Sequence, residues 1–175
     1  MIRFIKINAL VFAMATAFSC DKLDELTEFN ITQDFSSVVY VDVIEDSEGA
    51  VQIWSQSATL DIASNDQIQE NLDLIQDVKI SSITFKIINF TGVEGAVATE
   101  ASLSFEDTVI SVSDIQLEDS TTIYTIGSDS ELSAIANDLK NDVEITTTAS
   151  GKVSSTPVKF DVYISLDVTT TIDVL

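Results

Sequence analysis

"PVKFDVYISLDVTTTIDVL", residues 157–175, is the stretch that decides the fold. Apolar residues occupy every second position over most of this run, a period typical of a half-buried strand. They are Val158, Phe160, Val162, Ile164, Leu166, Val168, Ile172 and Val174. At about 3.3 Å per residue the run is longer than an ordinary strand, so we expect it to bend or to cross between two sheets. Pro157, the only proline, stands at its start, where a missing N–H does least harm.

The same alternation, rich in Val, Ile, Thr and Phe, recurs upstream. It predicts strands at about 30–43, 51–63, 78–90, 96–105, 108–117, 121–126 and 143–153. "EDSEGA" (45–50) is a turn signal, so the first two strands are expected to form a hairpin. Strands of this number with one polar face predict a mainly all-β fold, an antiparallel β-sandwich.

Two segments have a helical pattern instead. "SNDQIQENLDLIQ" starts with Ser64 and Gln67, and "SDSELSAIANDLK" starts with Ser128 and Glu131. Both pairs have the spacing of a capping box, in which each side chain satisfies a backbone N–H at the helix start. Apolar stripes follow, so we expect two short amphipathic helices at about 65–77 and 128–141 that cover a sheet end or edge.

Both helices are followed by a similar strand start, "DVKIS" (77–81) and "DVEIT" (142–146). One interpretation is that residues 28–175 form a single β-sandwich domain of two similar halves, divided near Asp107. The alternative is that helix-to-strand junctions favour the same residue types. The sequence leaves both open.

Composition excludes several kinds of chemistry. The chain has no histidine and one cysteine, which removes Ser-His-Asp and Cys-His catalysis, internal disulfides and nearly all zinc, copper and iron sites. The formal net charge is −21. Nucleic acid is not an expected partner, because its binding requires Lys and Arg to neutralise phosphates.

The N-terminus has the organisation of a secretory signal peptide, predicted at residues 1–19. Arg3 and Lys6 provide positive charge, residues 9–18 are almost all apolar, and Ala17 and Ser19 flank the end before Cys20. Cleavage there would leave 20–27 as a polar tether. It would remove two basic residues and no acidic one, so the formal charge would become −23.

Ala17-Phe18-Ser19-Cys20 resembles the lipobox of bacterial lipoproteins, in which the cysteine is acylated and becomes the mature N-terminus. The acidic residues that follow resemble the export signal of Bacteroidota-type outer-membrane lipoproteins. The resemblance implies a protein held in the bilayer through lipidated Cys20, facing the periplasm or the cell surface. Two or more acyl chains are enough for durable anchoring.

Acidic residues gather around the 45–50 turn, where Asp42, Glu45, Asp46 and Glu48 lie close to a glycine. Carboxylates of this kind are calcium ligands, so calcium is the one cofactor that the sequence suggests. The alternative is a solvated turn, and adjacent carboxylates elsewhere in the chain have the same explanation.

Aromatic residues provide the other recognition chemistry. Trp54 shares its strand parity with Leu60 and Ile62, which favours a core position over a sugar-stacking surface. Tyr40, Tyr124 and Tyr163 fit either role.

Thr108 and Ser120 each follow an aspartate, in Asp107-Thr108-Val109 and Asp119-Ser120-Thr121. These tripeptides resemble the O-glycosylation sites of exported proteins in the same bacterial group, although chance matches are expected in a chain this rich in Ser and Thr.

The leading hypothesis is a membrane-tethered, non-enzymatic β-sandwich lipoprotein, expected as a monomer, that binds a glycan or an envelope protein. One alternative is a carboxylate-dependent polysaccharide hydrolase, which needs two facing carboxyl groups in a cleft. The other is a purely structural component of the envelope.

Overall fold

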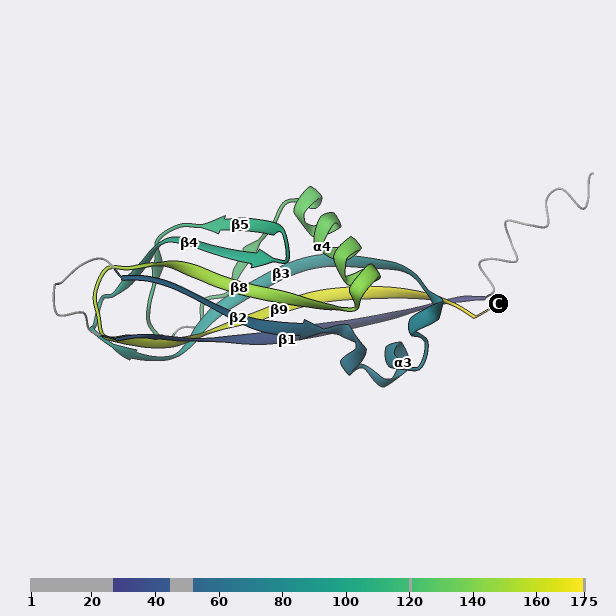
Figure 1. The fold of residues 1–175 in the computed structure, drawn as a ribbon, viewed down its shortest axis with the longest axis horizontal. Helices are drawn as coiled ribbons and strands as arrows, with labels where there is room; N and C mark the ends of the chain where they lie inside the picture. The colour runs from purple at the N-terminus through teal and green to yellow at the C-terminus, as the bar shows by residue number, and fades with distance from the viewer. Residues whose placement is uncertain (1–26, 45–51, 120, 175) are drawn as a thin grey trace, which may run out of the picture.

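Two antiparallel β-sheets pack face to face in the computed structural model, which describes residues 27–44, 52–119 and 121–174 (Figure 1). The first sheet has the order β1-β9-β3-β7, with bounds Glu28–Val43, Val158–Asp173, Ile75–Gly92 and Tyr124–Ile126. The second has the order β2-β8-β4-β5, with bounds Gln52–Asp61, Glu144–Val153, Val97–Phe105 and Thr108–Val112. The short β6, Ile115–Gln116, pairs with β4. The predicted all-β sandwich is confirmed.

Strand β9 forms the centre of the first sheet. All 16 of its residues pair with β1 on one side, and β3 pairs with it on the other. The expected crossing between two sheets is therefore wrong: both neighbouring strands are as long as β9, so it finds partners in one sheet throughout. The register of β3 shifts between Ile80 and Ser82, among other places, and such bulges let a long strand twist without leaving its sheet.

Strands β1 and β2 do not form the predicted hairpin. β1 pairs with β9, whereas β2 pairs with β8, so the two strands belong to different sheets. They lie close to each other at neighbouring edges of the sandwich. The prediction failed because each strand has a partner more than 80 residues away, and a local turn signal carries no information about such pairing.

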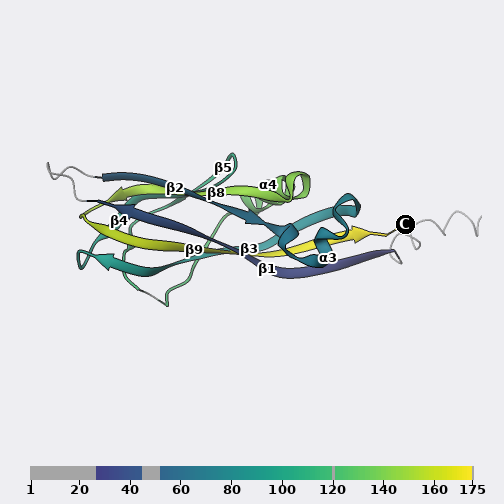
Figure 2. The same ribbon diagram turned by 60° about the horizontal axis from the view of Figure 1, so that its bottom comes forward.

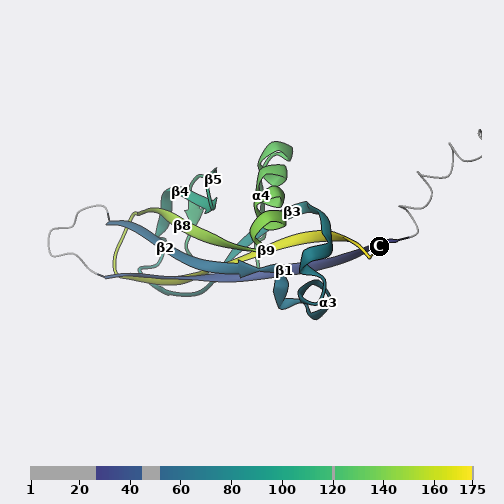
Figure 3. The same ribbon diagram turned by 45° about the vertical axis from the view of Figure 1, so that its right-hand side comes forward.

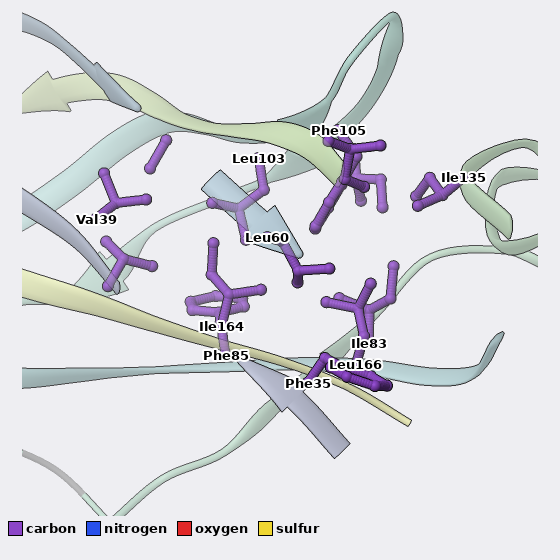
Figure 4. Close-up of a cluster of buried hydrophobic side chains, with 14 of the residues drawn as sticks. Phe35, Val39, Leu60, Ile83, Phe85, Leu103, Phe105, Ile135, Ile164 and Leu166 are labelled. Atoms are coloured by element: carbon purple, nitrogen blue, oxygen red, sulfur yellow. The ribbon is translucent and has the colours of Figure 1, made fainter. Parts of the chain in front are cut away.

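The core lies between the sheets and follows the predicted alternation (Figure 4). Phe160, Ile164 and Leu166 of β9 are fully buried in it. Thr170 occupies a buried position on the same face, whereas Val174, which was predicted there, is 52% exposed because it lies beyond the end of β9.

One polar contact joins the sheets inside the core. The hydroxyl groups of Ser37 on β1 and Thr147 on β8 lie 3.0 Å apart, and the Thr147 hydroxyl donates to the carbonyl of Ala58 at 2.9 Å. Because buried hydroxyls are costly without partners, this chain of bonds fixes how the sheets lie on each other.

The second predicted helix is confirmed as α4, Asp129–Asp142, which begins at the expected capping box. The first is wrong over most of its length. A 3-10 turn, Ile62–Ser64, precedes a single helical turn, α3, Asp66–Gln69, and a second 3-10 turn covers Leu72–Leu74 before β3 begins at Ile75 (Figure 2). Its cap is Asn65 rather than Ser64, since the Asn65 side chain accepts from the N–H groups of Gln67 and Ile68.

The first residues of β1 and the last residues of β9 lie at the same end of the molecule, on the right of Figure 1. There the Val174 N–H donates to the Thr27 carbonyl at 3.1 Å. Strand β3 also begins at this end, because Ile75 pairs with Ile172. Helix α4 lies across the strands next to β3 (Figure 3).

Candidate functional site

A groove of about 760 Å3 lies between β3 and α4. Its strand wall consists of five consecutive residues, Asp77, Val78, Lys79, Ile80 and Ser81. Its helix wall consists of Asp129, Leu132, Ser133, Ala136, Asn137 and Lys140. The groove therefore has one wall from a strand edge and one wall from a single helix face.

The strand wall is an edge that no strand in the described part of the chain covers. On this side β3 pairs with β7 only at residues 83–85, whereas residues 77–80 pair only with β9, on the other side, and Ser81 lies at a shift in that register. Val78 and Ile80 are buried toward the core, and Asp77, Lys79 and Ser81 are exposed. An unpaired edge of this kind presents free backbone donors and acceptors.

The helix wall is placed by the junction after β7. Gly127 has φ +91°, a conformation that side-chain-bearing residues rarely adopt, and a Cβ there would lie 3.0 Å from Leu132 Cδ2. The Glu131 carboxylate then accepts from the Ser128 N–H at 2.7 Å, which fixes the helix start. Ile135 and Leu139 are fully buried, and Figure 4 shows Ile135 pointing from α4 toward the core.

Charge in the groove differs from charge elsewhere on the molecule. The described part of the chain contains five lysines. Lys152 pairs with Glu100 at 2.5 Å, Lys159 pairs with Asp42 at 2.7 Å, and Lys86 Nζ lies 5.1 Å from the centre of the Tyr163 ring. Lys79 and Lys140 form no ion pair within the described residues, and both line the groove. In a chain of net charge −21, the groove thus combines two lysines that form no ion pair with two aspartates, Asp77 and Asp129.

Most of the residues predicted as sites fall elsewhere or outside the described residues. Asp42 is exposed on β1 and bonded to Lys159, while Glu45, Asp46 and Glu48 lie outside the described residues. The calcium site thus stays a prediction. In the described part of the chain, no group of three or more His, Cys, Asp or Glu side chains is arranged to hold a metal ion.

The predicted modification sites are equally separate from the groove. Thr108 is half-buried as the first residue of β5. Cys20 and Ser120 lie outside the described residues, as do the predicted signal peptide and almost all of the tether.

The aromatic side chains divide between core and surface. Trp54 is 8% exposed and meets Phe160 edge-on at 5.4 Å, which confirms the predicted core role. Tyr124 stacks on Phe85 at 4.9 Å. Tyr40 is 72% exposed, the most open aromatic ring among the described residues.

Carboxylates gather at the C-terminal half of α4 and the β4–β5 turn. Partial burial raises the pKa of the Asp138 carboxyl, and the negative charges of Asp107, Glu106 and Asp142 raise it further. The Glu106 carboxylate already accepts from the Thr146 N–H at 2.5 Å, and none of the four side chains lines the groove. This cluster therefore lies apart from the groove, whose own carboxylates are Asp77 and Asp129.

Sequence reasoning did not identify the groove. It predicted α4 and its buried stripe, but Lys79, Asn137 and Lys140 looked like ordinary solvated residues. The one available signal was that the helix directly follows β7. This strand has three residues and is too short to cover the edge of β3. That signal becomes useful only when the partner of β7 is known.

No helix among the described residues is long and apolar enough to cross a membrane. The chain matches no protein-family model and no curated protein.

Proposed function

We propose that this chain is a non-enzymatic binding domain, tethered to the outer membrane through acylated Cys20, that engages an envelope protein in the groove between β3 and α4. The observation that carries the proposal is the groove itself, which combines an open strand edge, a helix face and two unpaired lysines. Clefts with a few converging polar groups are the usual places for ligands.

The position of the groove favours a partner that also belongs to the envelope. Lys79 pairs with Thr169, four residues before Asp173 at the end of β9. The groove therefore lies about 13 Å from the end where the described chain begins, at about 3.3 Å per residue. A domain tethered at that end would hold the groove close to the membrane surface.

The absence of histidine supports a binding role over catalysis, because it removes the commonest general acid and base. The four carboxylates around Asp138 do not offset this, since they lie away from the groove.

Site-specific photo-crosslinking in native membranes tests the groove. A photoreactive residue at Asn137, which lines the groove, is expected to give a discrete adduct with an envelope protein. The same residue at Ala134, exposed on α4 outside the groove, is the matched control. No adduct from position 137, or the same adducts from both positions, would remove the groove from the proposal.

Intact mass of the membrane-extracted protein tests the tether separately. The expected mass is that of residues 20–175 plus acyl chains. A bare polypeptide mass would contradict anchoring through Cys20 and leave the groove unaffected.

A further inference from the structure

The open part of β3 has the length of a short peptide-binding site. Residues 77–81 are consecutive, so both faces of the strand contribute to the groove and the groove runs along the strand edge. At about 3.3 Å per residue the open segment is about 16 Å long. That length accommodates an extended segment of about five residues.

Strand β7 shows that this edge accepts a partner. It pairs antiparallel with β3 at Ile83, Thr84 and Phe85, and the chain then leaves the sheet at Gly127 to begin α4. A segment added beside residues 77–81 would continue the line of β7 along the same edge. Its backbone would form hydrogen bonds with the edge of β3, and its side chains would alternate between the two faces of the sheet.

The helix wall offers matching contacts for such a segment. Ala136 is buried and Leu132 half-buried, which gives a small apolar surface, while Ser133 and Asn137 are exposed polar side chains beside it. A helix packed directly on the edge would only shield it from aggregation. Helix α4 packs against β3, and a groove of about 760 Å3 stays open beside that contact.

Lys79 on the strand and Lys140 on the helix are the groups in the groove that a carboxylate of the segment could meet. Both line the groove, and neither has a carboxylate partner within the described residues. Asp77 and Asp129 also line it, so the groove is close to neutral as a whole. At physiological salt the Debye length is about 8 Å, so the distant acidic surface contributes little to the field in the groove.

We infer that the ligand is an extended polypeptide segment that adds to the edge of β3 as a strand and places a carboxylate against Lys79 or Lys140. The inference rests on the proposed function, because it specifies what the same groove binds. The carboxylate comes from an Asp or Glu side chain or from a free C-terminus.

Selection from random twelve-residue peptides displayed on phage tests the inference with the full-length protein in detergent. One library displays internal segments and the other displays free C-termini, which distinguishes the two sources of the carboxylate. Counter-selection uses the Asn137→Trp variant, whose groove is filled, and Ala134→Trp is the control that keeps binding. Enrichment of Asp and Glu, or of free C-termini, is expected. No enrichment over Asn137→Trp, or enrichment of Lys and Arg, would overturn the inference.

A selected peptide then reports the binding mode. Hydrogen exchange is expected to slow at backbone amides within residues 77–81 when the peptide binds. Methylating two alternate peptide nitrogens that face β3 should weaken binding about tenfold, because each loses a backbone hydrogen bond. Lys79→Gln and Lys140→Gln should each weaken it by roughly threefold, as for exposed ion pairs, and should leave the folded structure unchanged. Unchanged affinity of the methylated peptide would show that the peptide does not add as a strand.

The outcomes separate this inference from the proposed function. A groove-dependent crosslink at position 137 without peptide selection would mean that a folded surface occupies the groove, and the strand-addition inference would fall alone. Absence of both results would remove the groove as a binding site altogether.

Discussion

Residues 62–74 and residues 128–142 have the same start signal and different structures. Each contains a serine followed three residues later by Gln or Glu, Ser64 with Gln67 and Ser128 with Glu131, and each continues with an apolar stripe. The second becomes a helix of 14 residues, whereas the first contains a helix of four residues between two 3-10 turns.

Burial explains the difference. In α4, Ile135, Ala136 and Leu139 are buried against the sheets, so every turn of the helix is held by packing. In the first segment Ile62 and Ile68 are buried, while Leu72 and Leu74, which follow α3, are each 39% exposed. A capping signal determines where a helix can start, and tertiary packing determines how far it continues, because short helices are marginal on their own.

The largest predicted effect concerns one fully buried side chain from each segment. Ile68→Ala and Leu139→Ala should each lower the free energy of unfolding by about 2–5 kcal/mol, because both side chains are fully buried. Leu72→Ala, at a partly exposed position, should cost clearly less. Urea unfolding measures all three. A cost for Ile68→Ala no larger than that of Leu72→Ala would mean that residues 62–74 are not part of the cooperative fold.

A smaller effect is expected at the cap of the first segment. Asn65→Ala should cost about 1 kcal/mol, because the Asn65 side-chain oxygen accepts from two backbone N–H groups at 2.9 and 3.1 Å. Ser64→Ala should cost less, since the Ser64 hydroxyl donates to the Asp61 carbonyl and caps nothing. Thermal unfolding of the two variants distinguishes them. A larger loss of stability for Ser64→Ala than for Asn65→Ala would mean that Ser64 is the cap, as the sequence predicted.

The cap of α4 should give a pH-dependent effect. Hydrogen bonds from the backbone N–H and hydroxyl of Ser128 hold the pKa of the Glu131 carboxyl below its usual value of 4.5. A lowered pKa stabilises the fold above that pH and loses this contribution as pH falls through the folded value. Glu131→Gln should therefore unfold more easily than the native chain at pH 7, with the difference shrinking below pH 4.5. A difference that persists unchanged in acid would contradict this.

The smallest effect, of opposite sign, is expected at Asp138. Its raised pKa means that the folded chain holds the proton more tightly than the unfolded chain. Stability from this group is therefore present at low pH and falls as pH rises from about 3.8 through the folded value. Asp138→Asn should be slightly more stable than the native chain at pH 7 and should have no advantage in strong acid. Unfolding midpoints across this pH range measure the change.

Much of the fold could be predicted from period-two alternation. The inward positions of β9 were identified from Val158 to Leu166 without knowing any partner. In β3 the buried parity changes from Ile80 to Ile83, because the register with β9 shifts there. The two serines between them permit the bulge, but only the pairing shows it.

The candidate site depends on long-range pairing that the sequence does not contain. The predicted strand at 121–126 pairs over only three residues, and this shortness leaves the edge at residues 77–81 open. Asp42 shows the same limit: it was grouped with its sequence neighbours, yet its ion-pair partner is Lys159, 117 residues away. Local patterns therefore predict elements and faces, whereas open edges and charge partners follow from topology.

The position of β9 between β1 and β3 has a mechanical consequence. A ligand held on β3 and an anchor before β1 would pull on the first sheet from two strands that do not touch each other. The tension would pass through β9 along both ladders, roughly parallel to the strands and perpendicular to their hydrogen bonds. The tether and the ligand would both act at the end where β1 and β3 begin, so the load would enter and leave β9 near residues 169–173. The pairs that β9 forms with its two neighbours at this end would therefore connect the proposed ligand to the proposed tether.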